Sequence, residues 1–231
     1  MTTQPRLVEV RSRILKENDV LARQLRERFQ QAGVCVISFV SSPGSGKTSF
    51  LEKLMLRLGE RHRIAALVGD LATDNDAARL GRACKQVRQI TTGTICHLDA
   101  KMIAAALEGW DLEELDFLFI ENVGNLVCPS SYDLGEQMRV VLLSATEGED
   151  KPLKYPTIFN TSDVALITKI DMAAAAEFDR EAARGNILRV RPGMRIHEVS
   201  SKNGEGMAEV EAFFEGQLRV GFGDRWAGKF P

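Results

Sequence analysis

The sequence predicts a doubly wound α/β protein, in which helices cover both faces of a mostly parallel β-sheet. Short runs rich in β-branched and aromatic residues alternate along the chain with segments whose apolar residues recur at helical spacing. One of these runs, residues 34–40, is apolar at all but one position, as a strand buried on both faces is. The 231 residues, 44% of them hydrophobic, suffice for one large core.

The order of the expected elements locates the candidate site. Strands are expected at residues 34–40, 63–68, 86–90, 116–120, 139–144, 164–168 and 195–199, the third being weak. Helices are expected at residues 50–58, 74–83, 98–107, 173–184 and 206–219. Because ligands of such sheets bind at the carboxyl ends of the strands, the polar residues that follow each strand are the candidates.

The chain is expected to divide into an N-terminal helical extension, residues 1–31, and one α/β domain, residues 32–231. Apolar residues at helical spacing over residues 7–31 predict two helices, with Asn18 and Asp19 as the break and cap between them. The Arg-rich remainder of this segment is most simply a solvated face.

Composition and charge argue against several classes of partner. The formal net charge of −2 gives no general reason to expect nucleic acid. No apolar run approaches the roughly 18 residues needed to cross a bilayer, and the charged start lacks the apolar region of a signal peptide. Four widely separated cysteines are typical of reduced thiols. The expectation is a cytoplasmic protein that binds neither nucleic acid nor membrane.

A phosphate-binding loop follows the first expected strand, at residues 41–48, SSPGSGKT. Its glycines let successive backbone N–H groups face an anion, and the next helix adds its positive N-terminal end. Lys47 would reach the terminal phosphates, and Thr48 would ligate Mg²⁺. The remaining residues expected to contact nucleotide here are Gly44, Ser45, Gly46 and Ser49. The usual pattern has Gly where this chain has Ser41, and the alternative is an ordinary glycine turn.

Carboxylates close two later strands and indicate a magnesium site. Asp70 follows the strand at residues 63–68, and Glu121 follows the strand at residues 116–120. With Lys47 and Thr48, they form the expected catalytic group. Gly124 could bring a backbone N–H to a terminal phosphate. Residues 73–76, TDND, add acid that either caps a helix or positions water.

The segment Thr168-Lys169-Ile170-Asp171 favours guanine as the base. Asp171 can accept hydrogen bonds from the N1–H and the exocyclic amine of guanine, which adenine cannot supply, while the stem of Lys169 packs over the base. GTPases normally have Asn where Thr168 stands. The loop after the last strand, with Ser201 and Lys202, would approach the guanine O6. A helix start at Lys169 and Asp171 is the alternative.

Cys96 and His97 form a third candidate site with Cys128. Thiolate and imidazole suit zinc or nickel and not magnesium. Three ligands leave a four-coordinate shell unfinished, and a two-fold dimer could share ligands of both chains. The alternative is that these residues are unremarkable, as Cys35 and Cys84 are expected to be.

These segments resemble the hydrogenase nickel-incorporation GTPases, the HypB family. The resemblance runs from about residue 34 to residue 214 and is carried by SSPGSGKT, GDLATDNDAARL, TTGTICHLDA, FLFIENVGNLVCP, TEGEDKPLKYPTIF, ITKID and VSSKNGEGM. It implies a SIMIBI-like P-loop GTPase that uses GTP and Mg²⁺ and carries nickel, or zinc in its place, at Cys96, His97 and Cys128. It also implies a homodimer that depends on nucleotide and metal.

The implied partners are a HypA-type zinc protein and the precursor of the nickel-iron hydrogenase large subunit. Some members carry a cysteine motif or a histidine-rich tract near the N terminus that binds extra nickel, and residues 1–31 here contain neither.

Three other functions compete with this one. A urease-type nickel GTPase would show a Cys-Pro-His metal motif, which Cys96-His97 does not match. An ATP-dependent small-molecule kinase would prefer adenine and phosphorylate an acceptor. A nucleotide-gated interaction module would dimerise with GTP but bind no metal.

Overall fold

The computed structural model describes the backbone of residues 4–70 and 75–222, and the side chains of residues 12–70 and 76–218. In these residues one seven-stranded sheet forms the centre, in the order β3-β2-β4-β1-β5-β6-β7. Every neighbouring pair of strands is parallel. The strands are β1 (Cys35–Ser41), β2 (Ile64–Asp70), β3 (Gln86–Thr91), β4 (Phe117–Glu121), β5 (Met138–Ser144), β6 (Val164–Thr168) and β7 (Arg195–Val199).

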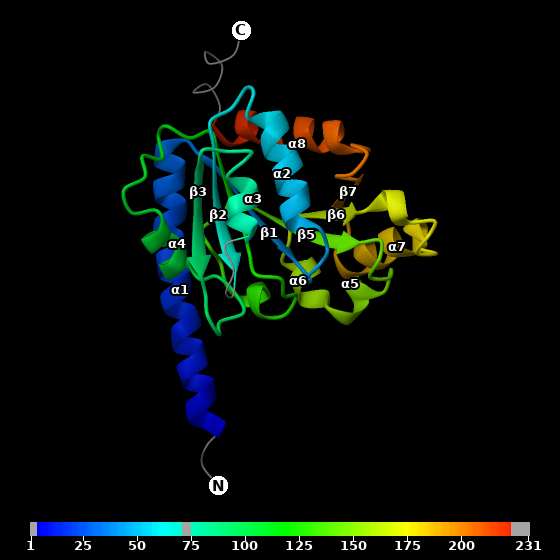
Figure 1. The fold of residues 1–231 in the computed structure, drawn as a ribbon. Coiled ribbons are helices and arrows are strands. Elements are labelled where there is room, and N and C mark those ends of the chain that lie inside the picture. Colours follow the sequence, from blue (N-terminus) through cyan, green and yellow to red (C-terminus); the bar gives the residue numbers. More distant parts are fainter. Residues whose placement is uncertain (1–3, 71–74, 223–231) are drawn as a thin grey trace.

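Helices cover both faces of this sheet (Figure 1). On one face, α2 (Lys47–Leu58) and α8 (Met207–Phe222) pack on alternate residues of the central strands, beside α3 (Asn75–Leu80). On the other face lie α1 (Gln4–Ala32), α4 (Ala100–Ala106) and α7 (Arg180–Val190), with the short helices α5 (Lys151–Lys154) and α6 (Pro156–Asn160). The doubly wound α/β prediction is therefore confirmed, and each predicted strand is present.

Strand register brings the predicted site residues to one edge. Glu121 at the end of β4 pairs with Phe39 of β1 on one side and with Val68 of β2 on the other. The phosphate loop leaves β1 two residues after Phe39, and Asp70 ends β2 two residues after Val68. Because all strands are parallel, these three strand ends open onto the same side of the sheet.

The N-terminal segment is one helix, so the predicted break at Asn18 and Asp19 is wrong. Asn18 is buried, its Nδ2 donates to the Asp133 carbonyl (2.9 Å), and its Oδ1 accepts from the Ala100 N–H (2.9 Å). The side chain therefore joins α1 to two other segments and does not cap a helix. The C-terminal half of α1 enters the core through Ala22, Leu25 and Phe29, and its N-terminal half extends past the body (Figure 1).

Two other helix predictions need correction. The helix expected at residues 173–184 begins only at Arg180, where Asp179 caps it by accepting from the Ala182 N–H (2.9 Å). Glu177, which interrupts the predicted range, has a positive φ of 51°, which ends a right-handed helix. The helix expected at residues 74–83 is α3, and Asp74 lies outside the described residues.

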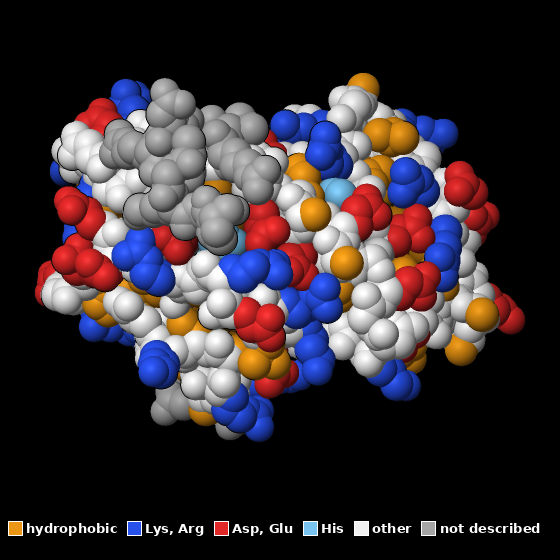
Figure 2. Space-filling model, turned by 90° about the horizontal axis from the view of Figure 1, so that it is seen from above, with side chains coloured by type: hydrophobic (Ala, Val, Ile, Leu, Met, Phe, Trp, Pro, Cys, Tyr) orange, Lys and Arg blue, Asp and Glu red, His pale blue; other side chains and the backbone are white. Residues whose placement is uncertain are grey.

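Charged side chains of both signs alternate over the end of the molecule that is seen from above in Figure 2. Among the ion pairs of the described residues, Arg57 and Arg61 both pair with Glu211 of α8. In the described residues no helix is both long and apolar enough to span a membrane.

Candidate nucleotide and metal sites

The phosphate loop has the backbone that the sequence predicted. Gly44 and Gly46 have φ values of 73° and 92°, in the left-handed region that only glycine enters without strain. Helix α2 starts directly after Gly46, at Lys47. The turn therefore delivers the helix N-terminus, with its free N–H groups, to the end of β1.

Ser41, which replaces the usual first glycine, holds the lysine of the loop. The Lys47 Nζ donates to the Ser41 Oγ (3.0 Å), and the Ser45 hydroxyl donates to the same oxygen. Burial lowers the pKa of Lys47, against the opposing effect of the nearby Glu121 carboxylate. The departure from the usual pattern thus adds an acceptor for a buried ammonium group.

The phosphate side of the site is a cavity of about 490 Å³ whose lining includes Lys47, Thr48, Asp70, Glu121 and Gly124. Thr48 Oγ1 donates to Glu121 Oε1 (2.7 Å), whereas the buried Oε2 has no hydrogen-bond partner among the described residues. Burial raises the pKa of Glu121 to about 7. The Thr48 hydroxyl and the carboxylates of Asp70 and Glu121, one of whose oxygens has no partner among the described residues, are a donor set that fits Mg²⁺.

Gly124 makes the loop after β4 pack directly on the phosphate loop. A Cβ at this position would lie 2.9 Å from the Cα of Pro43, closer than side-chain carbons approach a backbone. The absence of a side chain at Gly124 therefore allows the two loops to touch. Because they are in contact, a displacement of the phosphate loop would also displace the loop that follows β4.

The base side is a second cavity, of about 320 Å³, and all the residues predicted to contact the base line it. These residues are Thr168, Lys169, Asp171, Ser201 and Lys202. Thr168 Oγ1 donates to the Ser45 carbonyl (2.7 Å), so threonine ties the base loop to the phosphate loop where GTPases normally have asparagine. The Lys169 Nζ donates to the Gly44 carbonyl (2.6 Å).

Ser200 orients the carboxylate of Asp171, and the sequence did not indicate this role. Its Oγ donates to the Asp171 Oδ1 at 2.6 Å. Ser200 is fully buried, so this bond fixes the carboxylate that would face a guanine. A serine before two further polar residues carries no signal that distinguishes the one that points inward.

Cys96, His97 and Cys128 converge, as predicted, although they come from two loops. Their potential ligand atoms all lie within 4.8 Å of one another, and the two sulfurs are 2.8 Å apart. The His97 ring stacks on Tyr132 at 3.9 Å between centroids, and burial lowers the pKa of His97, which favours the neutral, ligating imidazole. Its Nδ1 has no hydrogen-bond partner among the described residues. One chain therefore supplies all three side chains, with the two-sulfur, one-nitrogen chemistry of zinc and nickel sites.

Two asparagines connect the metal cluster to the end of β4. Asn122, buried directly after Glu121, accepts from the Leu98 N–H (3.1 Å), which belongs to the residue after His97. Asn125 donates to the Cys96 carbonyl (3.3 Å). The loop that carries Glu121 and Gly124 is thus hydrogen-bonded to the loop that carries Cys96 and His97.

Known proteins match the sequence and the fold of this chain. The model of the "CobW/HypB/UreG, nucleotide-binding domain" family matches residues 35–198. The hydrogenase maturation factor HypB of Azotobacter vinelandii is 46% identical over 215 residues, 93% of this chain and 71% of the relative. The hydrogenase/urease maturation factor HypB of Helicobacter hepaticus is 43% identical over 212 residues, 90% of this chain and 87% of the relative.

A solved HypB structure also resembles this chain in fold and sequence. HypB from Helicobacter pylori, crystallised in complex with nickel, aligns with a TM-score of 0.84 and 41% identity, over 89% of this chain and 97% of that one. Fold, nucleotide-binding domain and sequence identity over nearly the whole chain agree. The chain belongs to the HypB family of hydrogenase maturation factors.

Proposed function

We propose that this chain hydrolyses GTP and uses the cycle to hold and release nickel for insertion into a nickel-iron hydrogenase. The observation that carries the proposal is the hydrogen-bonded contact between the two sites. Asn122 and Asn125, on the loop that follows Glu121, hold the segment that contains Cys96 and His97. A metal cluster attached to a nucleotide site in this way can respond to the state of the nucleotide.

Guanine is the base that the second cavity favours. Asp171 is a fixed acceptor there, since Ser200 occupies one of its oxygens and leaves the other for a base donor. Guanine presents two adjacent donors on its Watson–Crick edge, whereas adenine would place an acceptor against the carboxylate. Lys169 and Lys202 line the same cavity and can pack along the base.

The phosphate cavity supports hydrolysis through charge and position. Lys47 would donate to the terminal phosphate oxygens in place of Ser41, and Thr48, Asp70 and Glu121 would hold Mg²⁺, which neutralises phosphate charge when bound. Phosphoryl transfer relies mostly on such electrostatic stabilisation, so these residues need only orient the groups. Turnover is expected to be slow without a partner protein.

Nickel is the cargo in this proposal, and zinc can take its place. The crystallised relative from Helicobacter pylori is a nickel complex, which supports the assignment of Cys96, His97 and Cys128 as ligands. These three leave a coordination position for a further ligand, which a second copy of the chain, a HypA-type zinc protein or the hydrogenase large-subunit precursor would supply. The name of the Helicobacter hepaticus relative favours urease as a second recipient of the metal.

The guanine assignment is tested by Asp171→Asn. We expect this change to weaken GTP binding by roughly 1.5–3 kcal/mol and to shift preference toward xanthine nucleotide, whose 2-oxo group needs a donor. The measurement is competition of GTP, XTP and ATP against a fluorescent nucleotide. Unchanged GTP affinity would remove the guanine-reading role, and tight ATP binding with transfer to an acceptor would favour a kinase.

A further inference from the structure

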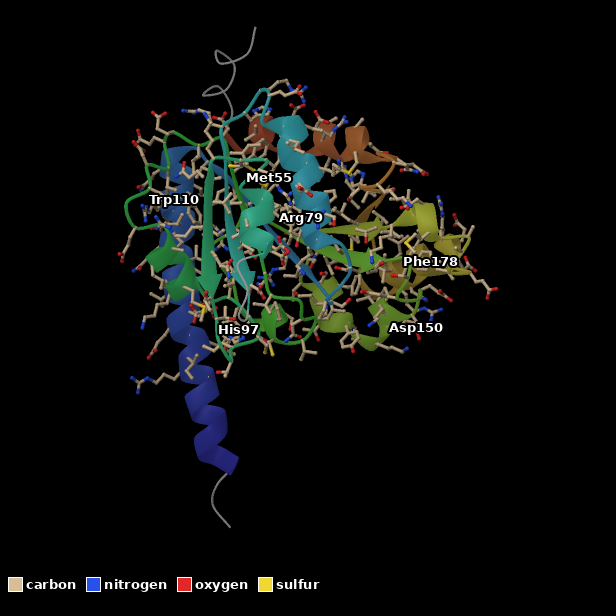
Figure 3. The ribbon with its side chains drawn as sticks, in the orientation of Figure 1. Met55, Arg79, His97, Trp110, Asp150 and Phe178 are labelled. Atoms are coloured by element: carbon tan, nitrogen blue, oxygen red, sulfur yellow. The ribbon has the colours of Figure 1, made fainter. Side chains whose placement is uncertain are left out.

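Arg79, to which the sequence motifs assign no role, lies between the two halves of the nucleotide site. The phosphate cavity and the base cavity share four lining residues: Gly46, Ser49, Lys169 and Arg79. Gly46 and Lys169 belong to the phosphate and base loops and Ser49 to the first turn of α2, whereas Arg79 reaches the boundary from α3. Figure 3 shows Arg79 between α3 and α2.

The present partner of Arg79 is a carboxylate outside both cavities. Its Nε donates to Glu52 Oε2 of α2 at 2.7 Å, and the two side chains are 38% and 17% exposed. Asp76, one turn earlier on α3, also lines the phosphate cavity. Helix α3 therefore presents both residues toward the nucleotide, as side chains three positions apart share a face.

A nucleotide that fills both cavities must cross their shared boundary with its phosphate chain. Its base would lie against Asp171, and its terminal phosphates would lie against Lys47. Phosphate oxygens near Ser49 then come within the range of the Arg79 guanidinium, whose planar fork matches two of these oxygens at once. An ion pair between partly exposed side chains is weak, so Arg79 can leave Glu52 at little cost.

We propose that Arg79 is a catalytic residue that exchanges Glu52 for phosphate oxygens of the bound nucleoside triphosphate. This inference rests on the proposed hydrolysis of GTP. When the oxygen of water bonds to the terminal phosphorus, the bond to the bridging oxygen breaks and negative charge grows on the diphosphate that leaves. The proton lost by water goes to the released phosphate. Arg79 keeps its own protons and stabilises the charge by hydrogen bonds.

The test compares four variants of the full chain with Mg²⁺ present: Arg79→Ala, Arg79→Lys, Glu52→Gln and Arg82→Ala. Steady-state GTP hydrolysis gives kcat and KM, and a non-hydrolysable GTP analogue gives affinity. We expect Arg79→Ala to lower kcat/KM at least about tenfold, and Arg79→Lys to recover part of the loss because it keeps the charge.

Glu52→Gln and Arg82→Ala are the matched controls. Arg82 also approaches Glu52, with its Nη2 3.9 Å from the Oε1, but its side chain is 72% exposed and lines neither cavity. Both controls are expected to stay within about twofold of the wild-type kcat/KM, since neither removes Arg79 from the nucleotide. Thermal unfolding checks that each variant is folded, and Arg79→Lys keeps the comparison valid where Arg79→Ala does not fold.

Two results would overturn the proposal. One is wild-type kcat/KM in Arg79→Ala. The other is an equal loss in Glu52→Gln, which would show that the pair acts only by joining α3 to α2. A wild-type chain that hydrolyses ATP in place of GTP would refute the guanine assignment alone, and the same four variants assayed with ATP would still decide the role of Arg79.

Discussion

In the nucleotide site, Lys47 donates to Ser41 and Thr48 donates to Glu121, and in the metal cluster the Cys96 thiol contacts the sulfur of Cys128. Each site also holds one buried polar atom without a hydrogen-bond partner among the described residues, Glu121 Oε2 in the first and His97 Nδ1 in the second. In the nucleotide site Ser41, Lys47 and Glu121 are buried and Thr48 is half-buried, and all four come from the ends of regular elements. The metal ligands are half-buried and come from two loops, and Figure 3 shows His97 below the ends of the strands. Both sets lie at the same edge of the sheet.

This difference indicates that the nucleotide site is preorganised, whereas the geometry of the metal site can change with its loops. The sheet and α2 hold the nucleotide residues in place before any ligand binds, so binding needs little reorganisation. The metal residues depend on loops whose positions follow Asn122 and Asn125. We therefore expect substitutions in the metal cluster to leave nucleotide binding by the metal-free protein intact, while changes at the nucleotide site alter metal binding.

The largest expected effect follows from the removal of one metal ligand, which should weaken metal binding and leave nucleotide binding unchanged. We expect Cys96→Ser or Cys128→Ser to weaken nickel and zinc binding more than about 100-fold, since even residues that only orient ligands contribute 10–100-fold. GTP affinity should remain near that of the wild type. Isothermal titration with each metal and with the GTP analogue measures both quantities on the same preparation.

Cys84→Ser is the matched control for this loss. Cys84 also carries a thiol, but its Sγ donates to the Ile64 carbonyl and lies outside the cluster. It should bind metal as the wild type does. Retained metal affinity in both Cys96→Ser and Cys128→Ser would refute the assignment of the cluster.

A second, smaller effect concerns the charge of Glu121 in the nucleotide-free protein. Its pKa is raised to about 7 by burial, with Lys47 and Thr48 opposing the shift and Asp76 and Asp70 adding to it. The folded state therefore keeps a proton that the unfolded chain loses near its ordinary pKa of 4.5. Stability should fall as pH rises from about 4.5 to 7 and then level off, by about 3 kcal/mol at most.

Glu121→Gln resembles the protonated form, so it should remove this loss and be more stable than the wild type at pH 8 without Mg²⁺. The contribution of Lys47 to the pH dependence of stability has the opposite sign. Because burial lowers the pKa of Lys47, this contribution makes the protein more stable as pH rises toward the ordinary lysine pKa of 10.5. The difference in the free energy of unfolding between wild type and Glu121→Gln isolates the contribution of the Glu121 carboxyl group. Urea unfolding between pH 4 and 8 measures it, with the exposed Glu60→Gln as control. Parallel pH profiles of wild type and Glu121→Gln would show that folding does not shift the pKa of Glu121.

The same comparison explains what the sequence could predict. The phosphate loop is contiguous, so its glycines, Lys47 and Thr48 can be recognised from local spacing. The metal cluster joins Cys96 and Cys128 across β4, and only the resemblance to known relatives linked them strongly. Arg79 and Ser200 lie in segments that resemble those of relatives, but the roles given to them here depend on tertiary position, which no local pattern encodes.

The errors in the helices have a related cause. Asn18 followed by Asp19 is a good local signal for a helix cap, but the fold uses Asn18 for two buried hydrogen bonds inside a continuous helix. The run of alanines after Met172 has high helix propensity, yet the chain turns at Glu177 and the helix starts three residues later. In both places tertiary structure overrode a weak local preference.

The smallest expected effect concerns the hydrogen-bonded connection between the nucleotide site and the metal cluster. It tests directly whether the state of one site changes binding at the other. Asn125 makes two bonds: its Oδ1 accepts from the Val127 N–H (2.8 Å), and its Nδ2 donates to the Cys96 carbonyl (3.3 Å). Asn125→Asp keeps the first bond and removes the second. The quantity to measure is the ratio of nickel affinities in the GDP state and in the GTP-analogue state.

We expect the wild-type ratio to differ from one, and Asn125→Asp to bring it closer to one by up to about tenfold, the value of one hydrogen bond. The added charge should raise metal affinity in both states and so cancel from the ratio. By linkage, nickel must change the affinity for GTP analogue relative to GDP by the same factor, and a second titration verifies this. A wild-type ratio of one would leave a protein with two independent sites, whereas an unchanged ratio in Asn125→Asp would place the coupling in Asn122 and Gly124 instead.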